Sequence, residues 1–247
     1  MLAALYALTD DSFKLFLGLT NIPKYRFTPS RILDSRILQR IVDASSMASE
    51  HPLSPKDYND YEMVAHSKLI HTMLPSDVKT VLELIAHLEQ YLACPHNVSD
   101  DLSMLHFLRE LSVHECIGYL QHVFAVHELP FLFSSELEDT LAKALQNFNV
   151  GEVIGLLWSS IKAQLASLHA GRITEEKAAK NVIPNFERIL ARAITEKWQL
   201  TAFNRPAQIP QSFLSQITYQ IVLRSPDNGY GFSIQWFIDA YVHSQND

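Results

Sequence analysis

Apolar residues recur three and four positions apart along most of the chain, which is the spacing of one face of an α-helix. The first long example follows Thr28-Pro29-Ser30, where the serine can cap a helix and the proline suits the first turn. The apolar face after this start signal consists of Leu33, Ile37, Ile41 and Ala44. Similar signals predict helices near residues 9–19, 54–72 and 76–94.

The middle of the chain continues the helical pattern between well-marked start and stop signals. A helix is predicted over residues 99–128, which ends before a proline and either continues through Ser112 or breaks there. Ser134 begins the next predicted helix, and Thr174 begins a later one. Pro184 should kink or split that later helix, because an interior proline removes a hydrogen bond and clashes with the preceding turn.

The helix with the widest apolar face is predicted between Asn149, as its N-cap, and Gly171, at its C-terminal end. Its apolar positions are Ile154, Leu157, Trp158, Ile161, Leu165 and Leu168. A face of this width is typical of a helix that is covered on most sides. We therefore predict that this is the most buried helix of the protein.

The C-terminal part of the chain allows two interpretations. Residues 201–211 contain two prolines and predict a linker. Beyond it, residues 217–223 alternate between apolar and polar side chains, and a turn signal at 226–229 could join them to a second strand in a β-hairpin. Ser212 and Ser233 can instead cap two short helices. We favour the helices, because a lone hairpin on a helical body is less common.

Together these elements predict an all-α fold, with a single bundle-like domain of about eight to ten helices. Residues 1–200 would form the helical core domain and residues 201–211 the linker. Residues 212–247 would be an aromatic-rich segment packed on that core.

Composition and charge narrow the class of protein. Of the 247 residues, 47% are hydrophobic, which is ordinary for a globular protein. The formal net charge of −7 argues against a mainly nucleic-acid-binding role. Cys94 and Cys116 are too distant for a CxxC motif and are interpreted as core residues in a reducing compartment. Residues 1–8 are apolar but too short for a membrane span, and they lack the basic residues of a signal peptide. We expect a soluble cytoplasmic protein without membrane contact.

Three residues are candidates for a metal site. His106, Glu110 and His114 follow one another at four-residue spacing on the predicted helix 99–128, and two imidazoles with a carboxylate suit zinc or iron. The alternative is a set of surface acid–histidine pairs. The chain has no HExxH motif and no Glu-x-x-His pair on its predicted helices. No cofactor is therefore expected, with a transition metal such as Zn or Fe as the alternative.

A second candidate site is a basic helix near the N-terminus. Lys24, Arg26, Arg31, Arg36 and Arg40 are interrupted by a single acid, Asp34. Arg36 and Arg40 share the polar arc of their predicted helix and should be solvent-exposed, where they could bind an anion such as a phosphate. The alternative is an ordinary solvated face with Arg40 paired to Asp43.

Aromatic residues concentrate at the C-terminal end, and they are the third candidate. Tyr230, Trp236 and Tyr241 are predicted to contribute to a protein–protein or self-association surface, since Tyr and Trp combine apolar area with a polar tip. The alternative is that they fill the core of this end of the protein.

These observations favour one class of function over two others. The chain contains neither a GxSxG motif nor a glycine-rich phosphate-binding loop. The sequence therefore predicts a non-enzymatic interaction or regulatory protein that binds another protein, or itself, through helical faces and the aromatic C-terminal surface. The alternatives are a helical metal-dependent enzyme built on the His/Glu residues and, more weakly, a nucleic-acid-binding protein that uses the basic helix.

Overall fold

The described part of the protein is helical. The structure is a computed structural model, and it describes residues 27–37, 40, 86, 101–225, 227–231 and 233–236. These residues contain helices but no β-strand. The all-α class predicted from the sequence is therefore confirmed. The helices predicted near residues 9–19, 54–72 and 76–94 lie outside the described residues, apart from one helical position at Ala86.

The chain divides into two compact units whose boundaries differ from the predicted ones. One unit contains residues 1–98 and 210–224, and the other contains residues 99–209 and 225–247. The predicted linker, 201–211, therefore belongs largely to the second unit. This division follows contacts between distant parts of the sequence, which local turn and proline signals do not report.

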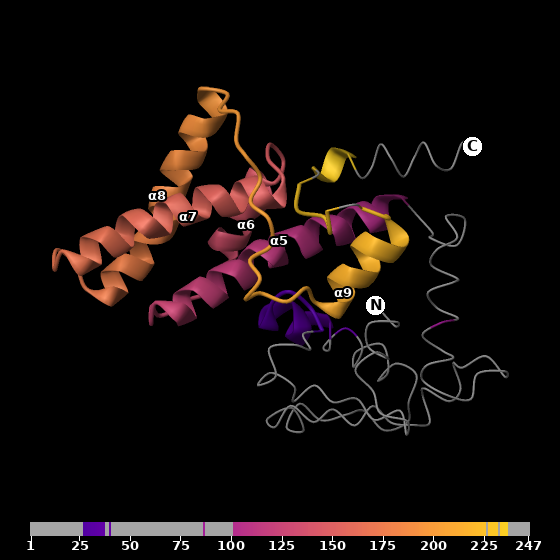
Figure 1. The fold of residues 1–247 in the computed structure, drawn as a ribbon, viewed down its shortest axis with the longest axis horizontal. Helices are drawn as coiled ribbons and strands as arrows, with labels where there is room; N and C mark the ends of the chain where they lie inside the picture. Colours follow the sequence, from indigo (N-terminus) through magenta and orange to yellow (C-terminus); the bar gives the residue numbers. More distant parts are fainter. Residues whose placement is uncertain are drawn as a thin grey trace, which may run out of the picture. The chain divides into compact units, whose positions relative to one another are not determined.

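Helix α5, Asp101–Val126, packs against α6 and α7 in the second unit (Figure 1). It passes through Ser112 without a break, and all residues from 111 to 120 are buried. In α7, by contrast, exposed side chains such as Lys162 interrupt the buried positions, and Trp158 is only half-buried. The prediction that the helix after Asn149 is the most buried is thus wrong. The apolar pattern does not predict burial on all sides of α5, because three of its buried residues are polar: Ser112, His114 and Glu115.

The next two helices begin at the caps that the sequence indicates. In α6, Ser135–Ala144, the Ser134 hydroxyl accepts a hydrogen bond from the amide of Leu137. In α7, Val150–His169, Asn149 and Glu152 bond reciprocally to each other's backbone amides, so the cap is a complete capping box. Gly171 follows α7 with φ +66°, a conformation that glycine adopts without steric cost.

Helix α8, Glu175–Thr195, lies alongside α7 (Figure 1) and continues through Pro184. The helix is therefore not split, although Pro184 has no amide hydrogen to donate. Side-chain hydrogen bonds join α7 to α8 next to this proline. The buried Ser160 hydroxyl of α7 donates to the Val182 carbonyl over 2.6 Å, and the Asn185 amide donates to the same hydroxyl over 3.0 Å.

Two non-helical segments are held against α5 and α7 in the same unit. The amide of Gly151 donates to the Tyr230 carbonyl over 2.8 Å, and the Gly151 carbonyl accepts from the Phe203 amide over 3.1 Å. Arg205 reaches Glu115 of α5 with two hydrogen bonds. The segment predicted as a linker is therefore packed on the helices rather than merely joining two parts of the chain.

The described residues of the other unit also include helices. Residues 31–37 form a helical segment whose first turn is capped by Ser30, with Leu33 and Ile37 buried. Helix α9, Phe213–Gln216, begins at the Ser212 cap and leads directly into a π-helix, η4, Ile217–Val222. The alternating residues of the hairpin interpretation, up to Val222, are thus helical. Their backbone bonds are made within the helix, so they do not form a strand.

Candidate interaction surface

Large apolar side chains are exposed where α5 ends and α6 has not yet begun. Val126 is 61% exposed, Leu132 is 70% exposed and Phe133 is 38% exposed. These three residues are here called the apolar loop surface. Most other large apolar residues of the described part are buried or half-buried, so three such residues within eight positions form a distinct local feature.

The backbone at the end of α5 explains why these side chains point outward. Glu128 adopts a left-handed conformation with φ 55°, and the Leu129 amide bonds back to the Phe124 carbonyl over 2.8 Å. This is the hydrogen-bond pattern of a Schellman helix end. Pro130 then prevents the helix from resuming. The chain turns sharply, and the residues after Pro130 no longer lie on the buried side of a helix.

Neighbouring aromatic contacts hold the loop in place. Phe131 packs edge-to-face on Phe124 of α5, with ring centroids 5.8 Å apart. On the other side, His127 stacks on the half-buried Trp158 of α7 at 6.4 Å. Leu129 is buried beneath them. The exposed residues are therefore carried on a loop that is anchored at several points.

The amino-acid sequence carries a signal for this surface that the candidate sites above do not include. Residues 131–133 are all apolar, yet they lie between a helix-ending proline and the Ser134 cap. Apolar residues in such a short connection belong neither to a helical stripe nor to an alternating strand. Loops lie at the surface, so an apolar loop predicts exposed apolar area.

The aromatic C-terminal candidate is only partly found at the surface. Tyr230 is 3% exposed, which contradicts its predicted place in a contact surface. Its hydroxyl lies 3.4 Å from a Glu115 carboxylate oxygen, and the Arg205 guanidinium lies 4.4 Å from the centroid of its ring. Tyr230 is therefore buried against the Glu115–Arg205 pair. Trp236 is 39% exposed, and Tyr241 lies outside the described residues.

The buried pair behind Tyr230 is a tight one. Arg205 donates two hydrogen bonds to the Glu115 carboxylate, of 3.0 and 2.9 Å, in the bidentate geometry that guanidinium and carboxylate favour. The side chains are 14% and 2% exposed. The glutamate oxygens are thus directed at a fixed partner, which makes this cluster a structural clamp rather than a reactive site.

The candidate metal ligands do not form a binding group. His106 is exposed, Glu110 is half-buried and His114 is fully buried, with its Nε2 atom 3.9 Å from a carboxylate oxygen of Glu138. Eight residues along a helix correspond to about 12 Å, so His106 and His114 cannot both reach one ion. Within the described part of the chain, no three His, Cys, Asp or Glu side chains are placed to hold a metal.

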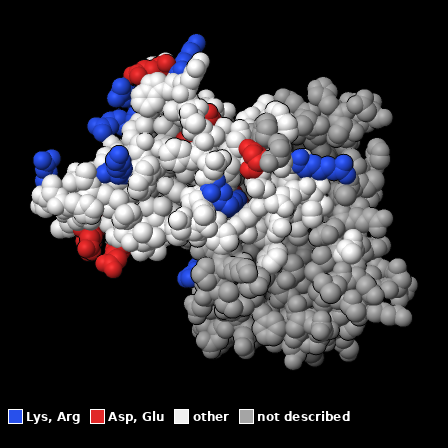
Figure 2. All heavy atoms as spheres, in the orientation of Figure 1, with Lys and Arg blue, Asp and Glu red and all other residues white. Residues whose placement is uncertain are grey.

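The two arginines of the basic helix differ in exposure. Arg40 is exposed, whereas Arg36 is half-buried, so the prediction that both are exposed holds only for Arg40. Asp34 is engaged locally, because its carboxylate accepts a hydrogen bond from the Thr28 amide over 3.0 Å. On the face seen in Figure 2, the described Lys and Arg side chains are scattered singly and in small groups among acidic and uncharged ones.

Cys116 lies in the fully buried stretch of α5. Burial raises the pKa of its thiol above the usual range, and the neighbouring Glu115 carboxylate adds to the effect. The thiol is thus kept in its protonated, unreactive form. Cys94 lies outside the described residues.

Comparison with known proteins adds no relative: no family model, no curated protein and no solved structure matches this chain. None of the helices in the described part combines the length and the apolar character that crossing a membrane requires.

Proposed function

We propose that this chain is a non-enzymatic interaction or regulatory protein that binds another protein through the apolar loop surface. The observation that carries the proposal is the 70% exposure of Leu132 on an anchored loop, with exposed Val126 and Phe133 within the same eight positions of the chain. Contiguous exposed apolar area on a folded protein commonly marks a contact site, because leaving it in water is unfavourable.

The anchoring of the loop supports this proposal energetically. Binding costs less when the contact residues are already ordered, because little conformational freedom is lost in the complex. The Schellman end at Glu128 and the Phe131–Phe124 contact supply that order. Burying a leucine side chain such as Leu132 contributes roughly 1.5–3 kcal/mol. A few side chains of this size can dominate the free energy of binding.

The aromatic end of the chain can contribute a second, smaller contact. Trp236 is 39% exposed, and tryptophan is enriched among the residues that dominate interfaces. This contact would be independent of the apolar loop surface. Trp236→Ala is therefore tested as a separate variant in the cross-linking assay described below.

The test is site-specific photo-cross-linking in the full-length chain, inside the cells that produce it. A photoreactive amino acid replaces Leu132, and in a second protein it replaces Lys180, an exposed residue of α8. We expect a discrete adduct from position 132 and none from position 180. Sedimentation of the purified protein then shows whether the adduct contains a second copy of this chain or a different protein.

A further variant isolates the apolar contribution. Val126→Ser together with Phe133→Ser, in the chain that carries the cross-linker at 132, should reduce the adduct strongly, because it removes apolar area on either side of Leu132 in the sequence. A thermal melt of the same variant checks that it is still folded. Equal adducts from positions 132 and 180, or an adduct that is unchanged by the two serines, would contradict the proposal. So would the absence of any adduct and of self-association.

A further inference from the structure

A second feature of the same unit is a cavity of about 170 Å³ between α5, α6 and the helical turn at residues 234–236. Its apolar wall is formed by Val113 of α5, Ala142 and Leu145 of α6, and Ile234. Cavities of about 150 Å³ hold a benzene-sized group, so the space is sufficient for a short hydrocarbon or phenyl group.

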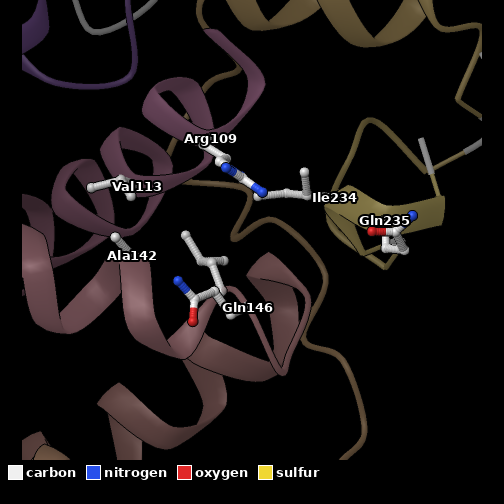
Figure 3. A pocket seen from close by; sticks show the side chains of 7 residues that line it. Arg109, Val113, Ala142, Gln146, Ile234 and Gln235 are labelled. Atoms are coloured by element: carbon white, nitrogen blue, oxygen red, sulfur yellow. The ribbon is translucent and has the colours of Figure 1, made fainter. Parts of the chain in front are cut away.

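The polar side chains of this cavity have a consistent chemistry. Arg109 lines it, and Figure 3 shows its side chain extending from α5 toward Ile234. The amides of Gln146 and Gln235 are the other polar groups in the wall. None of the described residues that line the cavity is acidic. The described lining therefore combines a positive charge and hydrogen-bonding amides with an apolar wall.

Among the residues that the structure describes, no acidic side chain pairs with Arg109. Among the hydrogen bonds and ion pairs of the described residues, none involves its guanidinium group, whereas Arg205 and Arg192 each hold a carboxylate. Planar guanidinium groups bind carboxylates in bidentate fashion, which makes a carboxylate the natural partner of Arg109.

We infer that this cavity is a binding site for a small organic acid that carries one carboxylate and one short apolar group. The carboxylate pairs with Arg109 at the cavity mouth, and the apolar group lies against Val113, Ala142 and Ile234. The amide of Gln146 donates a further hydrogen bond to the carboxylate. This site is independent of the apolar loop surface, and neither proposal requires the other.

The test is an NMR titration of the full chain with benzoate, and with benzamide as an uncharged molecule of the same shape. We expect benzoate to bind more tightly, and Arg109→Gln to weaken benzoate by about tenfold or more while leaving benzamide nearly unchanged. The matched control is Arg172→Gln, which removes the same charge from an exposed arginine in the loop after α7 and should change neither affinity. N-acetylphenylalanine, in a parallel titration, shows whether the carboxylate end of a peptide is also accepted.

Two more variants address the cavity itself. Ala142→Leu should fill the space and abolish benzoate binding. Gln146→Glu, at an exposed position that does not threaten the fold, should weaken it by placing a carboxylate beside Arg109. Equal affinity for benzoate and benzamide would overturn the inference. It would also be overturned by an unchanged affinity in Arg109→Gln, or by no benzoate binding up to about 10 mM.

Discussion

Gly151 is a position at which other parts of the chain reach the backbone of a helix. Its amide and its carbonyl both bond to segments outside α7, at Tyr230 and Phe203. A Cβ atom at this position would lie 2.4 Å from the carbonyl oxygen of Phe203. Glycine is therefore required here by close backbone approach, because a side chain would push the Phe203 segment away.

A matched pair of glycine substitutions tests this requirement. Gly151→Ala should destabilise the protein by roughly 1–3 kcal/mol, since backbone cannot move aside as a flexible side chain can. At Gly155, four residues further along α7, a Cβ would lie 3.7 Å from the Phe203 ring, an ordinary contact. Gly155→Ala should therefore stay within about 1 kcal/mol of the wild type and can be stabilising, because alanine favours helices. Chemical denaturation measures both, and equal effects would refute the argument.

The burial of Cys116 makes a second prediction at the scale of the residue. In a Cys94→Ser background, Cys116 should react with Ellman's reagent only as fast as the protein unfolds, because its raised pKa and its burial suppress the thiolate. Adding Ser159→Cys, at an exposed position of α7, provides a control thiol that should react rapidly. Rapid reaction of Cys116 in the folded protein would show that this part of α5 is accessible.

In helices α5 and α7, the observed burial differs from the burial that the apolar pattern predicts. The polar residues Ser112, His114 and Glu115 interrupt the apolar pattern of α5, yet they are buried with the rest of the stretch. The apolar stripe of α7 is buried at Ile154, Leu157 and Ile161 but becomes half-buried at Trp158 and Leu168. The pattern gives the direction of the core, and the neighbouring elements decide how far burial extends.

Two leucines of α7 test this gradient. Leu157→Ala should cost roughly 2–5 kcal/mol of unfolding free energy, because it leaves a cavity in a fully buried place. Leu168→Ala removes the same atoms from a half-buried position of the same helix and should cost clearly less, since solvent already reaches that site. Urea titration of both variants is sufficient. A loss at Leu157 no larger than that at Leu168 would contradict the observed burial.

The Glu115–Arg205 pair connects distant parts of the second unit. It joins residues 90 positions apart, and Tyr230 contacts the same glutamate. Glu115→Gln should destabilise the protein by roughly 3–5 kcal/mol, since the guanidinium is left buried without its counter-charge. The matched control, Glu196→Gln, breaks an exposed pair with Arg192 and should change stability little.

Replacing both charged residues separates the two contributions to this effect. Glu115→Met with Arg205→Met removes both charges together and should recover much of the loss, because no unpaired charge remains in the interior. Thermal or chemical unfolding measures the three variants. If Glu115→Gln costs as little as Glu196→Gln, the pair does not hold the segment around residue 205 in place.

The helical class and many helix starts follow from the amino-acid sequence alone. Ser134, Asn149, Thr174 and Ser212 each cap the helix that follows them, because a cap depends on a hydrogen bond within three residues. Gly171 was likewise identified from its place after an apolar stripe. Local interactions of this kind depend on residues that are close in the sequence, so they can be predicted without knowledge of the rest of the fold.

Which polar and aromatic residues are buried, and which apolar ones are exposed, depends on tertiary contacts that local sequence does not specify. Tyr230 and Glu115 meet across 115 positions, and Leu132 is exposed because α5 ends in a left-handed turn at Glu128. The spacing of His106 and His114 suggested one site, whereas the helix separates them along its axis. Burial depends on what distant segments place against a residue, and that information is not local to any one motif.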